Sequence, residues 1–443
     1  MTENVQKFTV SPLLRPLPQA WLTLWILVGL CVLSLLDRQI IALMIQPIRA
    51  DMGISDFEIS LLQGLAFGLF YACCGLPIGY LVDRHPRRLL IFAGVFIWSL
   101  ATAASGLANT FGLLLVARMA VGGAEAVLGP AAYSLIADLF PRERLAFVLS
   151  IFSMGGTLGA SLAFLLGGLL ISQLDTVSLS LPYVGALATW QLTFLTLGLP
   201  GLLIAFVIFV VREPIRRGLG GQPQAGDWQA FVAFLRLRGR LFSCLFVGCG
   251  LISMMGYGYL AWLPSYLIRS HGLSVLEVGT LMGVLIGASG VFGGLLSGWI
   301  VDRLFARGIK DAHLLYWTFA SIALAVLSAI AFTMPNLVSF CVVLVLIQML
   351  LPFSGVAAAA VQITTPDRFR GRASAVYILV FNILGLGLGA TAVATVTDFV
   401  FRDDARVGDA IMVTAMALGL IASLLFAMGR RSMRQAVADG ATA

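Results

Sequence analysis

Charged residues are scarce in this 443-residue chain, where they make up 11% of the sequence against 60% hydrophobic residues. Soluble domains carry about 25% charged residues and contain no succession of apolar runs of about 20 residues. The mean hydropathy of +0.98 therefore excludes that class of protein. A transmembrane barrel is excluded as well, because its sequence would show short segments of alternating hydrophobicity. We expect an all-α polytopic membrane protein.

The chain also has little of what most catalytic and metal sites need. It contains only three histidines, and its six cysteines lie within apolar segments without the spacing of metal ligands. Such cysteines are commonly small core residues, and no His/Cys arrangement suggests a nucleophile. We find neither a catalytic motif nor a channel-filter motif. The sequence predicts no enzymatic activity, no metal and no cofactor.

Neither a nucleic-acid patch nor a signal peptide can be recognised. The net charge of +7 comes from basic residues at the ends of apolar runs, which is typical of membrane proteins and does not indicate nucleic acid. The first apolar run, residues 21–45, is too long for a signal peptide and contains the charged pair Asp37 and Arg38. We expect it to be the first transmembrane helix.

What the chain does contain is one pattern written twice, in residues 55–84 and 274–303. Each copy begins with Ser-x-x-Glu, the capping box of a helix start, and ends with Gly-aromatic-x-Val-Asp-Arg. Glycines along each helix would let another backbone approach closely. A repeat offset by about half the chain predicts two related halves. The matched residues are Ser55, Glu58, Gly64, Gly68, Gly75, Gly79, Asp83 and Arg84, and Ser274, Glu277, Gly283, Gly287, Gly294, Gly298, Asp302 and Arg303.

The apolar runs predict twelve transmembrane helices in two six-helix bundles. The predicted spans are residues 21–45, 59–82, 89–108, 111–138, 145–172, 190–211, 241–268, 277–301, 313–334, 336–364, 373–398 and 410–429. The predicted domains are an N-terminal segment 1–20, a bundle 21–211, a linker 212–240, a second bundle 241–429 and a tail 430–443.

The positions of Lys and Arg predict the orientation of these spans, because cytoplasmic loops carry an excess of them. Placing both termini in the cytoplasm leaves only four of these residues outside, namely Arg49, Arg269, Arg402 and Arg406. We therefore expect an inner or plasma membrane protein with both termini cytoplasmic.

The linker contains aromatic residues at helical spacing, Trp228, Phe231 and Phe234, followed by basic residues. Such a segment fits an interfacial helix lying on an anionic leaflet. A simple tether between the bundles explains it equally well.

Four charged residues lie clearly inside predicted spans: Asp37, Arg38, Arg118 and Glu125. A charge in hydrocarbon costs about 2.5–3.5 kcal/mol on insertion scales, so those that persist are functional by default. At 1.5 Å per residue, Asp37 and Arg118 both lie roughly 10–12 Å from the outer surface. We expect them to pair, with Arg118 and Glu125 on one helix face because they are two turns apart.

These four charges fit a proton switch or a permanently ionised staple between two helices. In the switch, protonation of Asp37 frees Arg118 for a substrate anion or for Glu125. Glu125 lies deeper and has no adjacent cation in the sequence, which makes it the better candidate for holding a proton. Arg38 has no obvious partner. Asp138, near the end of its span, is expected to anchor a loop.

The second half has no charge between the ends of its spans. Several of its polarizable and aromatic residues fit either an apolar cavity or ordinary core. These residues are Met254, Met255, Tyr257, Tyr259, Phe353, Phe381 and Asn382.

The segment from Gly79 to Arg88, with its echo from Gly298 to Arg307, resembles the signature loop of the major facilitator superfamily, although Pro86 stands where that pattern usually has Gly. Several stretches of the first half resemble its Spinster-like group, among them Leu36-Asp37-Arg38 and Ala117–Ala126. The resemblance implies that two bundles rock about a central cavity lined by spans 1, 4, 7 and 10.

The same resemblance implies a conformational lock. Asp83 would pair near Arg370 and Arg372 at the start of span 11, and Asp302 would face Arg142 and Arg144 at the start of span 5. The implied lock residues are Gly79, Asp83, Arg84, Arg87, Arg88, Asp302 and Arg303.

We therefore expect a proton-coupled secondary transporter, an antiporter for a lysolipid or similar anionic amphiphile, because the Spinster-like group is similar to exporters of such lipids. Arg118 would bind the head and the uncharged second half the tail. The alternative is a carrier of small organic acids or drug-like amphiphiles. The expected partners are that substrate, protons and membrane lipids, and we expect a monomer.

Overall fold

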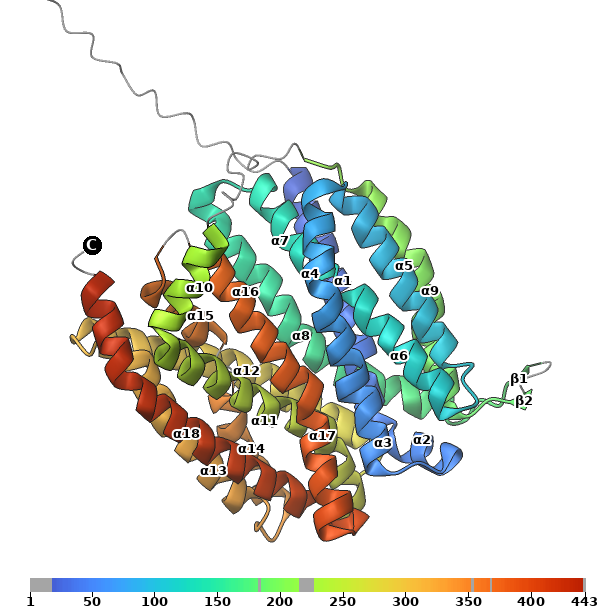
Figure 1. Ribbon diagram of the computed structural model, residues 1–443. Helices are drawn as coiled ribbons and strands as arrows, with labels where there is room; N and C mark the ends of the chain where they lie inside the picture. Colours follow the sequence, from blue (N-terminus) through green and yellow to red (C-terminus); the bar gives the residue numbers. More distant parts are fainter. Residues whose placement is uncertain (1–17, 182–184, 215–226, 352–353, 367–368, 441–443) are drawn as a thin grey trace, which may run out of the picture.

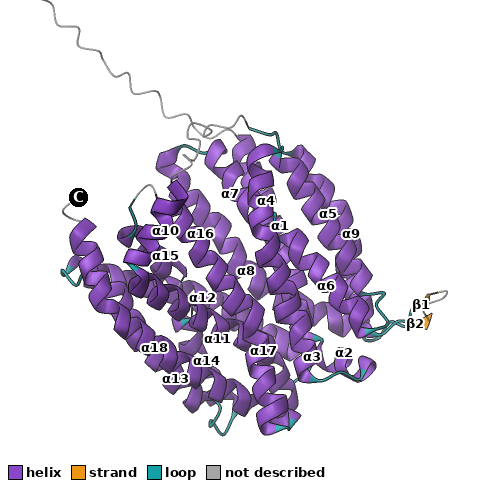
Figure 2. Cartoon of the chain, in the orientation of Figure 1, coloured by secondary structure: helices purple, strands orange, loops and turns teal. Residues whose placement is uncertain are grey.

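The computed structural model describes residues 18–181, 185–214, 227–351, 354–366 and 369–440. It is almost entirely helical (Figures 1 and 2), and twelve helical stretches, from Pro18–Leu43 to Asp404–Asp439, are long and apolar enough to cross a membrane. The predicted fold class is confirmed. Residues 1–17 and 215–226, within the predicted N-terminal segment and linker, lie outside the described residues.

The first half contains nine α-helices in the described residues, with a two-stranded hairpin before the last. They are α1 (Pro18–Ile40), α2 (Ile45–Met52), α3 (Asp56–Ser60), α4 (Ala66–Arg84), α5 (Arg87–Ser105), α6 (Phe111–Glu125), α7 (Leu128–Leu139), α8 (Arg142–Leu174), β1 (Ser180–Leu181), β2 (Gly185–Ala186) and α9 (Thr189–Ile204). Short helical turns extend α1, α3 and α9, namely η1 (Ile41–Leu43), η2 (Leu61–Leu65) and η3 (Ala205–Val210).

The second half begins with the linker helix. Its helices are α10 (Asp227–Leu237), α11 (Gly239–His271), α12 (Val275–Ala306), α13 (Ala312–Ala331), α14 (Leu337–Leu350), α15 (Ser354–Thr364), α16 (Arg370–Phe381), α17 (Leu388–Thr395) and α18 (Val407–Gly440). The π-helical turns η5 (Asn382–Gly387) and η6 (Val396–Phe401) join α16 and α17 into one stretch that ends at Phe401. The 3-10 turn η7 (Asp404–Arg406) leads directly into α18.

The predicted spans agree with these helices within a few residues, except at the end of the chain. The expected tail after residue 429 continues α18 as far as Gly440. Arg430 and Arg434 both bind the buried carboxylate of Asp311, with Nε–O distances of 2.7 and 3.0 Å. These ion pairs attach the extra turns of α18 to the loop before α13.

Both copies of the repeated pattern begin as predicted. The Ser55 and Ser274 hydroxyls accept hydrogen bonds from the Glu58 and Glu277 N–H groups, at 3.1 and 3.3 Å. Each glutamate in turn accepts from the N–H of its serine at 2.8 Å. These are complete capping boxes, so the same local signal starts the second span of each half.

The start of α1 and the end of α18 lie toward the top of Figure 1, which we call the terminal side; α2, α3 and the hairpin lie on the distal side. On the distal side, residues 40–48 of the first half belong to one continuous buried core with the second half. Toward the terminal side a separate core is built around Leu27, Trp98 and Leu135 of the first half, and Leu386 is its one buried member from the second half among the described residues. The halves therefore pack against each other on the distal side.

Glycines on α4 differ in the same way between the distal and the terminal side. A Cβ at Gly68 would lie 2.7 Å from the backbone of Gly387, so only glycine allows this approach of α4 to η5. Gly75 and Gly79, about two and three turns closer to the terminal side, would meet nothing within 4 Å.

The second copy of the pattern behaves alike on α12. A Cβ at Gly283 would lie 2.8 Å from the backbone oxygen of Ser161 on α8, and the Ser161 hydroxyl donates to the Gly283 carbonyl at 2.6 Å. Gly298, toward the terminal side, again meets nothing within 4 Å. The repeat therefore forms two equivalent contacts between the halves, and both end before the terminal side.

Candidate functional site

The expected pairing of Asp37 with Arg118 is present. Nη1 of Arg118 lies 3.5 Å from Oδ1 of Asp37, and both side chains are buried. The Thr102 hydroxyl on α5 donates to the other oxygen of Asp37. The carboxylate also borders a small pocket lined by Trp98 on α5 and Gly198 on α9. This pair therefore lies inside the first bundle and does not face the second half.

This position separates Arg118 from any substrate in the conformation described. The residue is 0% exposed, and its guanidinium lies 5.6 Å from the ring centroid of Phe67. Asp37 is its ion-pair partner among the described residues. The expectation that Arg118 binds a substrate head does not fit this geometry.

A second pair, Arg38 with Glu125, was not expected. Nη2 of Arg38 lies 2.7 Å from Oε2 of Glu125, and the Ser34 hydroxyl donates to the same oxygen at 2.7 Å. The Arg38 guanidinium also faces the rings of Phe67 and Tyr71, at 4.6 and 5.2 Å from their centroids. The sequence-based expectation that Glu125 lacks an adjacent cation is wrong.

The direction of the side chains explains why an estimate of residue depth alone did not predict the pair of Arg38 and Glu125. Glu125 lies two turns from Arg118, toward the terminal side, and is therefore level with Ser34 on α1. Side chains of a helix lean toward its N-terminus, and α1 begins on the terminal side. The long side chain of Arg38 can therefore reach Glu125 although its own Cα lies at the level of Asp37. Each of the two helices supplies one acid and one base, so the buried cluster is neutral.

Unlike Arg118, Arg38 lies at the interface between the halves. Its side chain is 12% exposed and borders a small pocket shared with Tyr257 on α11 and Leu386 of η5. Of the two arginines, Arg38 is the one that a molecule between the halves can contact.

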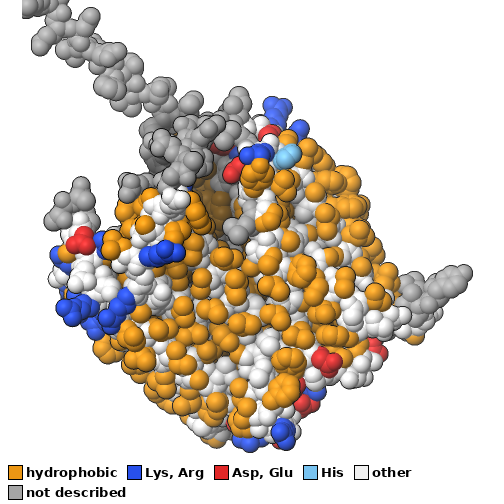
Figure 3. All heavy atoms as spheres, in the orientation of Figure 1, with side chains coloured by type: hydrophobic (Ala, Val, Ile, Leu, Met, Phe, Trp, Pro, Cys, Tyr) orange, Lys and Arg blue, Asp and Glu red, His pale blue; other side chains and the backbone are white. Residues whose placement is uncertain are grey.

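A larger cavity of about 270 Å³ lies next to Tyr71, between the two halves. Its wall is mostly apolar and comes from α4, the end of α6 with α7, and α16 with η5. The lining residues are Tyr71, Ala72, Gly75, Ala126, Gly129, Pro130, Tyr133, Ala375, Ile378, Leu379 and Asn382. Figure 3 shows the surface hollowed near α4 and α16, toward the terminal side.

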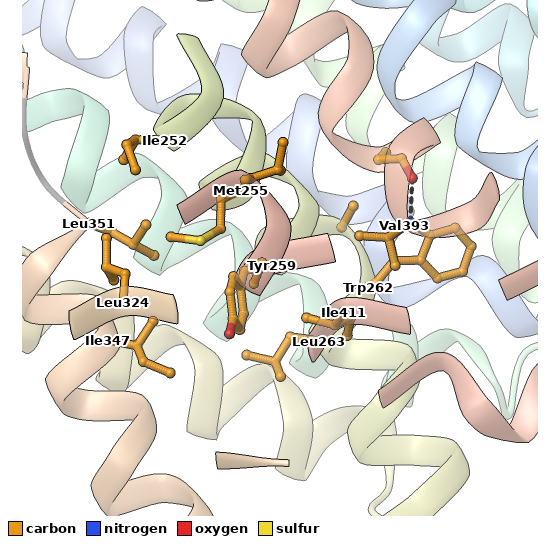
Figure 4. Packing of buried hydrophobic residues seen from close by; sticks show 14 of the residues in the cluster. Ile252, Met255, Tyr259, Trp262, Leu263, Leu324, Ile347, Leu351, Val393 and Ile411 are labelled. Atoms are coloured by element: carbon orange, nitrogen blue, oxygen red, sulfur yellow. Dashed lines mark hydrogen bonds between the residues drawn. The ribbon is translucent and has the colours of Figure 1, made fainter. Parts of the chain in front are cut away.

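The residues predicted to line an apolar cavity in the second half divide into two groups. Tyr257 and Asn382 border the pockets described above. Met255 and Tyr259 instead pack in the core of the second half (Figure 4), where the Tyr259 hydroxyl donates to Ser328 at 2.8 Å. Their helical spacing on α11 reflects core packing. Met254 and Phe381 are half-buried beside that core, and Phe353 lies outside the described residues.

The implied lock is not formed in this conformation. Asp83 is exposed, and no ion pair joins it to Arg370 or Arg372 within the described residues. Asp302 is exposed as well, and none joins it to Arg144 in the part of the chain described; the side chain of Arg142 lies outside that part. On this side Gly79 and Gly298, close to the two aspartates, have nothing within 4 Å of an added Cβ.

The arginines that follow these aspartates have local partners. Arg84 lies 3.7 Å from the ring centroid of Tyr80, and Arg303 lies 5.3 Å from that of Trp299. Each contact joins the Arg of the repeated pattern to the aromatic residue four positions earlier. They are cation–π contacts within one helix and connect nothing across the interface.

Arg87 serves the first half alone. Its buried guanidinium binds Asp138 at the end of α7 and Glu213 after η3, the latter with an Nε–Oε1 distance of 2.8 Å. The expectation that Asp138 anchors a loop is therefore confirmed. Glu213, which the sequence did not single out, also accepts from the N–H groups of Arg87 and Arg88.

The protonation of Glu213 follows from these contacts. Partial burial opposes its ionisation, but the hydrogen bonds from the Arg88 N–H and from Arg87 outweigh that effect. The pKa of Glu213 consequently lies below its ordinary value. Glu213 is thus an anion that holds the loop before α5, and Arg87 and Arg88 belong to this anchor in the conformation described.

A network of ion pairs closes the distal side, and we call it the distal gate. The buried carboxylate of Asp56 binds Arg49 of its own half at 2.9 Å and Arg269 of the second half at 2.7 Å. Arg49 also binds Asp404 of the second half at 2.7 Å. The Phe57 N–H donates to Asp398 at 2.7 Å. Three carboxylates, from Asp56, Asp398 and Asp404, gather here within 4.8 Å, and the two guanidinium groups offset their charge.

Sequence reasoning placed Arg49 and Arg269 on this side but assigned them no role. The available signal was their scarcity, since only four basic residues were expected here. Their ion-pair partners could not be predicted, because this requires the relative arrangement of the two halves, and the individual spans do not show it.

Comparison with known proteins agrees with this architecture. The family model of the Major Facilitator Superfamily matches residues 27–390. An MFS-type efflux pump of Mycolicibacterium smegmatis is 26% identical over 430 residues, 96% of this chain and 95% of that protein. A probable L-galactonate transporter of Escherichia coli is 28% identical over 295 residues, 63% of this chain and 60% of that protein. The sphingosine-1-phosphate transporter SPNS2 of Mus musculus is 28% identical over 248 residues, 54% of this chain and 42% of that protein.

Among solved structures, a bacterial homologue of the human lysosomal transporter Spinster, in an inward-facing and unoccupied conformation, has a TM-score of 0.76 to this chain. It is 25% identical, and the match covers 96% of this chain and 98% of that one. The chain is a multi-pass integral membrane protein that belongs to the Major Facilitator Superfamily and, within it, is similar to the Spinster group.

Proposed function

We propose that this chain is a proton-coupled secondary transporter that moves a lysolipid or a similar anionic amphiphile by alternating access. The observation that carries the proposal is the position of the Arg38–Glu125 pair. It lies at the interface between the halves, next to a mostly apolar cavity that adjoins Tyr71.

The division of polar and apolar groups supports an amphiphile. Arg38 is the cation at the interface, and a phosphate or carboxylate head would replace Glu125 as its partner. The cavity beside Tyr71 has a mostly apolar wall, formed by both halves, that could hold the acyl tail. This assignment differs from the sequence-based one in two ways: Arg38 replaces Arg118 at the head, and the tail site includes α4 and α7.

Proton coupling rests on the exchange of partners at Arg38. While Glu125 is ionised, it holds the guanidinium and excludes a substrate anion. A proton on Glu125 would weaken that ion pair and free Arg38 to bind the head. Release of the proton would restore the pair and expel the substrate. Asp37 and Arg118 form the second, fully buried pair on the same two helices, and we propose that Asp37 takes part in the same exchange.

The orientation follows from the positive-inside bias, which makes the terminal side cytoplasmic. The distal gate would then seal the outside, and the cavity would open to the cytoplasm. The similarity to a solved inward-facing structure supports this arrangement. Export of substrate against proton entry, by a monomer in an inner or plasma membrane, fits the similarity to an efflux pump.

A carrier of small organic acids is the second candidate, favoured by the similarity to a probable L-galactonate transporter. The same Arg38 would bind a carboxylate. A sugar acid, however, needs many hydroxyl partners, and Tyr71, Tyr133 and Asn382 are the polar side chains among the cavity lining. The mostly apolar wall therefore favours the amphiphile.

The test is proton-dependent uptake into liposomes of labelled lysophosphatidylglycerol, sphingosine-1-phosphate and galactonate. We expect the unaltered protein to transport a lysolipid. Arg38→Gln should abolish this transport, and in Glu125→Gln the transport should no longer respond to a pH gradient. Arg431→Gln, which removes an exposed cation near the end of α18, is the control and should retain proton-dependent transport. Transport of galactonate alone would end the lipid assignment, and unchanged proton dependence in Glu125→Gln would end the coupling assignment.

A further inference from the structure

Another pocket lies on the terminal side, away from the interface of the two halves. The end of α10, the start of α11 and the last turns of α18 enclose about 280 Å³. Figure 1 shows these segments together at the left of the molecule, and Figure 3 shows Lys and Arg side chains gathered at that end. No part of the candidate transport site reaches this pocket.

The pocket is built to receive an anion. Arg238 and Arg240 both line it, and only one carboxylate, that of Asp439, accompanies them. Asp439 binds Nη2 of Arg238 at 3.1 Å, which holds that guanidinium in place with its side chain 22% exposed. Arg240 is exposed, and no ion pair to it occurs within the described residues. Ser432 and Gln435 add hydroxyl and amide groups that can donate hydrogen bonds to an oxyanion.

The pocket also lies at the level of the lipid headgroups. The predicted span in α11 begins at residue 241 and the predicted span in α18 ends at residue 429. The start of α11 and the turns of α18 from Ser432 to Asp439 therefore lie where both helices leave the membrane. Leu237, which lines the pocket, is 84% exposed, and Trp228 on the same helix is 59% exposed. Exposed apolar side chains beside basic ones at a span end are typical of contact with the leaflet surface.

The linker helix does not simply lie on the leaflet, however. Phe231 is buried, and Phe231 and Phe234 face the ring of Phe369, with centroids 5.7 and 5.4 Å apart. The predicted interfacial helix therefore packs its inner face on the second half and presents Trp228 and Leu237 outward. A ligand in the pocket would touch both this helix and α18.

We propose that this pocket binds the headgroup of an anionic phospholipid from the leaflet on the terminal side. The phosphate lies between Arg240 and Arg238, and an acyl chain runs along Leu237. The bound lipid attaches the linker helix to α18 of the second half.

Native mass spectrometry of the purified full-length chain tests this, with phosphatidylglycerol and phosphatidylcholine added in equal amounts. We expect the protein to retain phosphatidylglycerol preferentially. Arg240→Gln should weaken that retention roughly fivefold, the effect of one basic residue near a membrane surface. Asp439→Asn should strengthen it, because it removes the carboxylate that competes for Arg238. Loss of a merely structural contact would not produce this gain.

Two controls separate this site from others. Arg431→Gln removes an exposed cation next to Ser432 that does not line the pocket, and it should retain the lipid as well as the unaltered chain does. Arg38→Gln should also retain it, which distinguishes this pocket from the transport site. Equal retention of both lipids, an equal loss in Arg431→Gln, or full displacement by millimolar inorganic phosphate would each overturn the proposal; the last would indicate a free-anion site.

Discussion

Arg38 and Arg118 each have one carboxylate partner, but their surroundings give the two pairs different properties. Arg118 is fully buried inside the first bundle, where no water can replace Asp37. Arg38 is partly exposed at the interface and also rests against the faces of Phe67 and Tyr71. An aromatic face stabilises a cation by about 0.5–2 kcal/mol. Arg38 can therefore lose Glu125 at a smaller cost than Arg118 can lose Asp37, as a site that exchanges partners requires.

This difference predicts unequal effects of two neutral substitutions on stability. Asp37→Asn leaves Arg118 as an unpaired buried charge and should lower the free energy of unfolding by about 3–5 kcal/mol. Glu125→Gln should cost clearly less, because Arg38 keeps its aromatic contacts and some access to water. Thermal unfolding of both purified variants in one detergent measures the order.

The double variant Asp37→Asn/Arg118→Gln is the control, because it removes the uncompensated charge and should recover much of the loss. If Glu125→Gln were the more damaging of the two single substitutions, the distinction drawn between the pairs would be wrong.

At the scale of helices, the repeated pattern produces equivalent contacts in both halves: α4 against η5 and α12 against α8. The glycines on the distal part of each helix allow backbone contact, while those closer to the terminal side face open space. Each helix therefore has one part that is packed in this conformation and another that would be free to pack if the halves rocked as proposed. The two capping boxes fix where these helices begin, so the glycines of both copies come to equivalent positions.

Gly68 and Gly79 provide a matched test of this arrangement. Gly68→Ala places a methyl group 2.7 Å from Gly387 and should destabilise the distal contact, so that the distal side opens more often. Gly79→Ala meets nothing within 4 Å and should preserve or slightly raise stability, since alanine favours a helix over glycine by about 0.5–1 kcal/mol. Thermal unfolding and accessibility of the interface to a thiol reagent report the two effects. Equal behaviour of the variants would contradict the role assigned to this contact.

The distal gate gives a second prediction about the contact between halves. Asp56 binds one arginine from each half, so Asp56→Asn should weaken both ion pairs and shift the population toward a distal-open state roughly tenfold, or about 1.4 kcal/mol. Distances between spin labels at Thr176 and Thr333, exposed residues on the distal side of opposite halves, measure the shift. Asp175→Asn is the control, because that exposed residue bonds within its own half. An unchanged distance distribution in Asp56→Asn would show that the gate does not hold the halves together.

The sequence predicts how deep each residue lies in the membrane, but it does not predict which residues of different helices contact each other. Span ends, both capping boxes and the common level of Asp37 and Arg118 follow from periodicity and rise per residue. Such arithmetic fixes depth, but it does not fix the rotation of a helix or the reach of a long side chain. The pairs formed by Arg38 and by Arg87 were missed for that reason. The distal gate was missed because it joins the two halves, and the sequence of a single span does not show how the halves are placed relative to each other.

For the whole molecule, we propose that these contacts represent one end of a conformational cycle. The distal side is closed by the distal gate and by the glycine contacts, while on the terminal side Asp83 and Asp302 have no ion pair across the halves within the described residues. Rocking toward the opposite state would open the first set of contacts and bring the second together. We propose that the lock implied by the family resemblance forms in that opposite state.

This assignment predicts a kinetic effect without a binding effect. Asp83 is exposed and makes no ion pair with any other residue that the structure describes, so Asp83→Asn should leave stability and substrate affinity in the terminal-open state unchanged. It should nevertheless slow transport, because the terminal-closed state would lose an ion pair near Arg370 and Arg372 and become less populated. The measurements are binding to the purified protein and turnover in liposomes, with Glu277→Gln, a substitution at an exposed distal cap, as the control. A loss of substrate affinity in Asp83→Asn would mean that Asp83 already acts in the terminal-open state. Normal turnover would mean that no lock forms at Asp83 in either state.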